Sequence, residues 1–182
     1  MIPVGYMAKR ISARPQWLNA GRVHDLYSVS NCISKDFTDY IGHWKHNGYW
    51  FFDTPATIRD LAKDNGIDLI GTTLFFYEAH DRQFDDTTGQ WVAFEPERAF
   101  TTQVTVPHRK ILQGFDVVTF SVGTSAECSP LSCNALAAEV ETNAHCLLAS
   151  LDQAQQLLEG GVFKNTEPGP CRIFVVYSLD WP

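Results

Sequence analysis

The sequence predicts an α+β protein: a mixed β-sheet with helices, built from two similar β-α-β-α-β-like halves about a pseudo-two-fold axis. The first observation is that segment 25–30 (Asp-Leu-Tyr-Ser-Val-Ser) resembles segment 116–121 (Asp-Val-Val-Thr-Phe-Ser). The second is that the pattern of segment 47–54 returns at 143–150. The third is that apolar runs of strand length alternate with helical patterns, which is typical of a sheet covered by helices.

These matches predict the organisation of the whole chain. We expect a single compact domain, residues 1–182, because this length is sufficient to bury one core. Within it, an internal duplication covers approximately residues 5–81 and 99–181, joined by a hairpin-like segment, 82–98. The alternative is a chance similarity between two stretches of α/β character.

In the first half, apolar residues at helical spacing and capping residues predict two helices, each followed by a strand. The predicted elements are a helix over 37–44 capped by Ser34, a strand over 49–52, a helix that begins at Thr54-Pro55 and ends at Gly66, and a strand over 72–79.

The second half repeats this pattern, and its helix at Ser150–Gln153 has the spacing of a capping box. A turn at 85–89, between Phe84 and Trp91, is expected from its Asp, Thr and Gly residues. The other predicted elements are strands over 101–106 and 115–122, a helix over 133–140, a strand over 145–148, a helix from Ser150 to Gly160, and a strand over 172–179.

The composition is that of a globular protein with an acidic surface. Of 182 residues, 45% are hydrophobic and 19% charged, and the formal net charge is −7. No cluster of Lys and Arg is present, so we expect no nucleic-acid partner. No stretch approaches the ~18 apolar residues of a membrane span, so we expect no membrane partner. An odd number of cysteines, five, and a start without a signal-peptide pattern favour a cytoplasmic protein.

The segment 127–134 contains the first candidate site. Cys128 lies directly before a Ser-Pro pair that could cap and begin a helix, and a thiol at a helix N-terminus has a lowered pKa. With His145 as base and Asn134 or Glu127 as the orienting group, Cys128 could be a catalytic nucleophile. A purely structural loop is the alternative.

Metal and cofactor sites are not expected. His43 and His46 lack a convincing second pair of ligands, and they suit the end of the predicted helix. The acidic residues near the central hairpin are expected to form a solvated face. The sequence also lacks the glycine-rich nucleotide-binding, nucleophile-elbow and H-E-x-x-H motifs. We therefore expect no cofactor.

The second candidate site is the aromatic segment 43–52. Tyr and Trp side chains offer a large contact area with a polar end, which favours a binding surface, whereas packing into the core is the alternative. The matching stretch of the second half carries smaller side chains, so the two halves differ here. The predicted ligand-binding residues are Trp44, His46, Tyr49 and Trp50.

A resemblance to a known family rests on three short segments spread over most of the chain: Trp44–Trp50, Glu127–Asn134 and Glu167–Pro170. In them the sequence resembles an uncharacterised family of bacterial proteins of the kind encoded in mobile integron gene cassettes. The resemblance implies a bacterial, cytoplasmic accessory protein, and it assigns no activity and no catalytic residue.

Two functions follow from these observations. The first is a cytoplasmic binding or protein-interaction module, whose aromatic site engages a small molecule or a protein partner without chemistry of its own. The second is a thiol-dependent enzyme for acyl or group transfer, with Cys128 as nucleophile and His145 as base. A structural component of a larger assembly is a third possibility.

Overall fold

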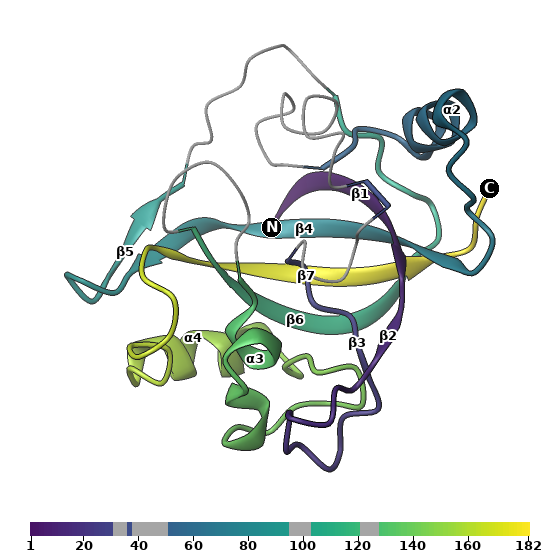
Figure 1. Ribbon diagram of the computed structural model, residues 1–182. Coiled ribbons are helices and arrows are strands. Elements are labelled where there is room, and N and C mark those ends of the chain that lie inside the picture. Colours follow the sequence, from purple (N-terminus) through teal and green to yellow (C-terminus); the bar gives the residue numbers. More distant parts are fainter. Residues whose placement is uncertain (31–35, 38–50, 95–102, 121–127) are drawn as a thin grey trace.

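The computed structural model describes residues 1–30, 36–37, 51–94, 103–120 and 128–182 (Figure 1). Its centre is a five-stranded antiparallel sheet in the order β1–β4–β7–β6, and β5 pairs with β4. The predicted α+β class is confirmed. The strands are β1 (Ile2–Arg10), β4 (Thr72–Asp85), β5 (Gln90–Ala93), β6 (Ile111–Thr119) and β7 (Cys171–Leu179), with β2 (Ser12–Ala13) and β3 (Asp25–Leu26) forming a separate ribbon. The helices are α2 (Pro55–Asn65), α3 (Pro130–Cys133), α4 (Leu151–Glu159) and the 3₁₀ helix η4 (Leu136–Ala138).

The prediction of a mixed sheet is wrong, because every described strand pair is antiparallel. The apolar runs that suggested strands covered on both faces have a simpler cause. Residues 74–77 of β4 and 173–176 of β7 are all buried, and successive residues of a strand point to opposite faces. This antiparallel sheet is therefore covered on both faces at its centre, which gives the same run of apolar residues as a parallel sheet.

Both helices with complete capping signals form as predicted. Thr54 caps α2 by accepting a hydrogen bond from the Thr57 backbone N–H, and Gly66 ends the helix in a left-handed conformation. Ser150 caps α4 by accepting from the Gln153 N–H. α2 lies beside β1, and α4 lies beside β6 (Figure 1).

Two predicted elements of the second half differ from the structure. The helix over 133–140 is replaced by α3 and η4, because Ala135 between them has a φ of 59° that interrupts a right-handed helix. The strand over 101–106 is absent from its described part, 103–106. Thr105 there makes single contacts: its N–H donates to the Asp53 carbonyl, and its own carbonyl accepts from the Tyr6 hydroxyl. The predicted helix over 37–44, apart from Phe37, and its cap lie outside the described residues.

The two outer strands of the sheet make like contacts. β1 is bulged between Pro3 and Gly5, and β6 between Leu112 and Gly114. The next residue of β1, Tyr6, exchanges two backbone hydrogen bonds with Phe52, and the next residue of β6, Phe115, does so with Leu148. The strands predicted over 49–52 and 145–148 are thus single bridges in the described chain.

The two similar segments 25–30 and 116–121 do not occupy equivalent positions in the fold. Segment 25–30 begins in the β2–β3 ribbon, whereas residues 116–119 lie in β6 of the central sheet. The resemblance between these two sequences comes from their common alternation of apolar and polar residues, which short and long strands share. The bulges and the bridges of Tyr6 and Phe115 show instead that β6 and β1 are the strands with similar contacts.

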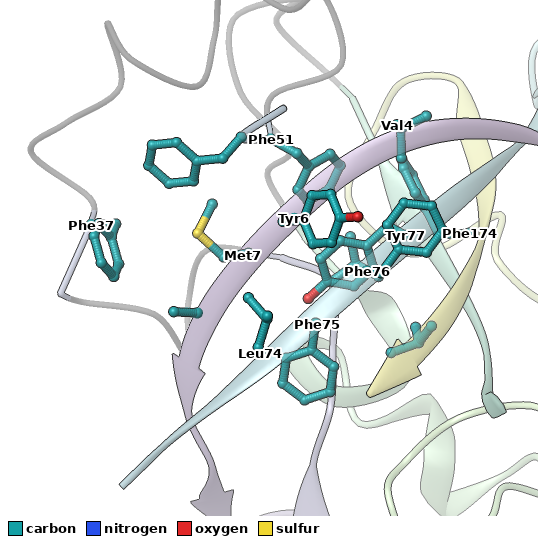
Figure 2. Packing of buried hydrophobic residues seen from close by; sticks show 14 of the residues in the cluster. Val4, Tyr6, Met7, Phe37, Phe51, Leu74, Phe75, Phe76, Tyr77 and Phe174 are labelled. Atoms are coloured by element: carbon teal, nitrogen blue, oxygen red, sulfur yellow. The ribbon is translucent and has the colours of Figure 1, made fainter. Parts of the chain in front are cut away.

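One face of the sheet carries a group of packed aromatic rings. Tyr77 of β4 is paired with Val176, two residues from Phe174 on β7, so both rings lie on this face. Phe51 covers them, with its ring centroid 4.7 Å from that of Tyr77 and 5.9 Å from that of Phe174. Figure 2 shows these three side chains within the apolar cluster. We call the surface formed by Phe51, Phe75, Tyr77, Phe120 and Phe174 the aromatic face.

Candidate functional site

A buried lysine lies on the aromatic face. Lys9 of β1 is 0% exposed. Its ammonium group donates to the carbonyl oxygens of Ser28, Val29 and Ser30 at 2.9, 2.8 and 3.1 Å, respectively. The same nitrogen lies 5.7 Å from the centroid of the Tyr77 ring. A positive charge is therefore held beside the buried phenol and fixes the backbone of residues 28–30 to the sheet.

A buried carboxylate on β6 faces the same region. Asp116 is paired with Phe174 in the register of β6 and β7, which places it on the aromatic face. Its Oδ2 accepts hydrogen bonds from the Val29 N–H at 2.7 Å and from the Ser129 hydroxyl at 2.6 Å. Burial raises the pKa of Asp116 to about 6, although these two hydrogen bonds and the charge of Lys9 lower it.

Two buried oxygen atoms of this region, the Tyr77 hydroxyl and Oδ1 of Asp116, have no hydrogen-bond partner among the residues that the structure describes. Burial raises the pKa of Tyr77 well above its usual value, and the charge of Asp116 adds to this. Nearly all buried polar groups in native proteins are hydrogen-bonded, so two such atoms on one sheet face require an explanation.

We call Lys9, Tyr77 and Asp116 the polar centre. Serine residues connect it to the neighbouring segments of the chain. The Ser28 and Ser132 hydroxyl oxygens are 2.7 Å apart, and the Ser30 N–H donates to the Ser129 hydroxyl oxygen at 3.1 Å. These bonds join the segment that follows β3 to the first turn of α3. Two parts of the chain about 100 residues apart are thus held together over Asp116.

The predicted nucleophile, Cys128, directly precedes Ser129 in the sequence, and its thiol contacts Asn134. Cys128 is buried, and its thiol donates to Oδ1 of Asn134, with a sulfur–oxygen distance of 3.6 Å. A Ser-Pro pair does begin a helix after it, but α3 has only four residues. The helix dipole expected to activate the thiol is therefore small. Glu127 lies outside the described residues.

The predicted base has an orienting carboxylate that the sequence did not identify. His145 Nδ1 is 2.6 Å from Oδ1 of Asp25, and its ring stacks on Tyr27 with centroids 4.0 Å apart. The Tyr27 N–H also donates to the His145 carbonyl. Asp25, rather than Asn134, orients this imidazole. The contact joins residues 120 positions apart, so no local spacing could indicate it.

The predicted ligand-binding residues Trp44, His46, Tyr49 and Trp50 lie outside the described residues. The end of their segment is described: Phe51 packs on the aromatic face, and Phe52 pairs with Tyr6. Within the described ranges, no group of three or more His, Cys, Asp or Glu side chains is arranged to hold a metal ion. In the same ranges, no helix is long and apolar enough to cross a membrane.

Comparison of the chain with protein-family models, with curated proteins and with solved structures finds no match. The interpretation of the site therefore depends on the geometry of the described residues alone. Two arrangements have a clear chemical character: the polar centre on the aromatic face and the Asp25–His145 pair.

Proposed function

We propose that the chain is a binding module for a small molecule and that the aromatic face, with Lys9, Tyr77 and Asp116, is its site. The observation that carries this proposal is the pair of buried, unpartnered oxygens of Tyr77 and Asp116. A polar group buried without a partner costs about 1–3 kcal/mol. A ligand that accepts from the Tyr77 hydroxyl and donates to Oδ1 of Asp116 removes that cost.

The surroundings of the two oxygens support a ligand with a flat apolar part. Small-molecule sites are mainly apolar and aromatic, with a few polar groups that fix the orientation of the ligand. The rings of Phe51, Phe75 and Phe174 supply the apolar surface around Tyr77. Trp44, His46, Tyr49 and Trp50 remain proposed ligand contacts, because their segment leads directly into Phe51.

The test is a fragment screen by protein-observed NMR, followed by affinity measurements on Tyr77→Phe. The variant removes one buried, unpartnered oxygen, so we expect binding to weaken at least tenfold while stability is kept or increased. Tyr177→Phe is the matched control: its hydroxyl already donates to Glu78 at 2.9 Å, so its loss should leave affinity unchanged. Equal affinity of Tyr77→Phe and wild type would contradict the proposal.

One observation favours a second function, the thiol-dependent enzyme. A carboxylate bound to Nδ1 of a histidine leaves Nε2 as a proton acceptor, and Asp25 holds His145 in this way. In this alternative His145 is the base and Cys128 the nucleophile. Alkylation of the folded protein with iodoacetamide between pH 5.5 and 8.5 tests it: selective, fast reaction of Cys128 at pH 6 supports the enzyme, and protection of Cys128 removes it.

We also propose that the two halves of the chain descend from an internal duplication. The like bulges of β1 and β6, the paired bridges of Tyr6 and Phe115, and the hydroxyl caps of α2 and α4 support this origin. We propose separately that the protein is cytoplasmic. It is supported by Cys146 and Cys171, two described cysteines that form no disulfide bond.

A further inference from the structure

A guanidinium group on the aromatic face is held between two rings. Arg172 of β7 lies two residues before Phe174 and so points to the same side of the sheet. Its guanidinium carbon is 3.5 Å from the centroid of the Phe94 ring and 3.7 Å from that of the Phe120 ring. Phe120 in turn stacks on Phe174 at 6.3 Å. Two aromatic rings thus contact the guanidinium group and restrict its position.

Among the described residues, Arg172 forms a side-chain hydrogen bond through Nε alone, so the edge with its two terminal nitrogens is open there. Its Nε donates to Oε1 of Gln83 at 3.1 Å, which fixes the rotation of the guanidinium within its plane. Among the described residues, no carboxylate forms an ion pair with it, whereas Arg10 is paired with Asp36 and Arg22 with Glu141. Burial lowers the pKa of Arg172 to about 9. A neighbouring carboxylate would act in the opposite direction.

A largely buried cation without a counter-charge is costly to a folded protein, because it loses hydration without gaining an ion pair. The two terminal nitrogens of a fixed guanidinium match the two oxygens of a carboxylate, with which they form parallel hydrogen bonds. The single positive charge of Arg172 neutralises one carboxylate, whereas a phosphate dianion requires more than one positive charge. The open edge of Arg172 therefore suits a singly charged, planar anion.

We infer that Arg172 binds a carboxylate and that the small molecule proposed for the aromatic face is an aromatic or otherwise flat carboxylic acid. This inference rests on the proposed function, because it assigns the ligand class of the same face. Arg172 receives the carboxylate, while Tyr77 and Asp116 contact a polar group elsewhere on the ligand.

The experiment uses benzoate as the probe, with benzamide as its uncharged equivalent. Binding to the full chain is followed by the ¹⁵N signal of Arg172 Nε and by the backbone signals of Phe94 and Phe120. We expect benzoate to shift these signals in a saturable way and benzamide to bind at least tenfold more weakly. If both probes bind equally, or if benzoate saturates without moving the Arg172 signal, the inference is wrong.

Three variants separate a binding role from a structural one. Arg172→Met keeps an apolar chain between the two rings, so we expect an unchanged or higher melting temperature together with loss of benzoate binding. Arg172→Lys keeps the charge without the planar fork, so affinity should fall at least tenfold. Arg22→Lys, at a surface pair, should bind benzoate as wild type does. A lower melting temperature of Arg172→Met with unchanged binding would identify a structural residue and overturn the inference.

The failure of the inference can be told from the failure of the proposed function. If benzoate does not bind but uncharged fragments bind the aromatic face and are lost in Tyr77→Phe, the carboxylate assignment is wrong and the binding module stands. If no fragment perturbs the signals of Tyr77, Asp116 or Arg172, both proposals are wrong.

Discussion

Lys9 shows how a single charged side chain can organise a buried region. Its ammonium group serves three backbone carbonyls and lies near Asp116, whose pKa it lowers. Lys9→Met should therefore leave these carbonyls without a donor and the carboxylate without compensation. We expect a loss of about 3 kcal/mol in the free energy of unfolding, measured by urea denaturation. Lys63→Met, at an exposed position of α2, is the control and should change stability by less than about 0.5 kcal/mol.

Asp116 should make stability depend on pH in an unusual direction. Its pKa of about 6 in the folded protein is above the ordinary value of 3.8, so the folded protein holds the proton more tightly than the unfolded chain. The cost of its charged form is fully present above pH 6 and disappears as pH falls toward 4. Its contribution to the free energy of unfolding should thus be about 2 kcal/mol larger at pH 4 than at pH 7.

The comparison with Asp116→Asn isolates this contribution from those of the other carboxylates. The free energy of unfolding of the variant, relative to wild type, should increase between pH 4 and pH 7 because asparagine does not titrate. Urea denaturation at four pH values across this range measures the difference. A constant difference would show that Asp116 titrates like an exposed carboxylate.

Strand β6 depends on a glycine at its bulge. Gly114 has a φ of 147°, and a Cβ there would lie 2.8 Å from both Leu147 Cβ and the Leu148 carbonyl oxygen. Gly114→Ala must therefore push β6 away from the segment that bridges it. We expect a loss of more than about 3 kcal/mol in thermal or urea unfolding.

The matched control for this prediction is Gly89→Ala in the turn between β4 and β5. Gly89 also has a positive φ, 68°, but no atom lies within 4 Å of the added Cβ. It should cost only about 1 kcal/mol, the ordinary penalty of a left-handed residue. Equal losses in the two variants would show that backbone conformation, and not the close contact at Gly114, determines the effect.

Elements with local signals could be predicted from the sequence, and contacts between distant residues could not. Thr54, Gly66 and Ser150 mark the ends of α2 and α4 correctly, because a cap acts within one turn. Asp25 was missed as the partner of His145, because their contact depends on how β3 lies against residues 144–145. The antiparallel arrangement likewise depends on which strands pair with each other, and an apolar run in the sequence does not indicate its partner strand.

At the scale of the whole molecule, two clusters of buried apolar side chains share the same strands. Val117 belongs to one cluster and Val118 to the other, and the same is true of Ile173 and Phe174. A strand that loses its partners on one face must therefore also release those on the other. The two clusters should unfold together, which is the behaviour expected of the single domain predicted from the sequence.

We therefore expect one cooperative transition in urea, with coincident curves from far-UV circular dichroism and tryptophan fluorescence. Val117→Ala and Val118→Ala should each shift this one transition, by about 2 kcal/mol, although they change different clusters. Separate transitions, or a shift seen by one probe only, would contradict the prediction.

The free thiols make such openings observable without any change to the chain. Burial raises the pKa values of Cys146 and Cys171 to about 12, so at pH 8 hardly any thiolate is present and the folded protein protects both sulfurs. Each can react with a thiol reagent only after its own surroundings open. The labelling rates of the two positions thus report the frequency of local openings at two places, beside His145 and at the first residue of β7. The native chain therefore already carries probes of its own fluctuations.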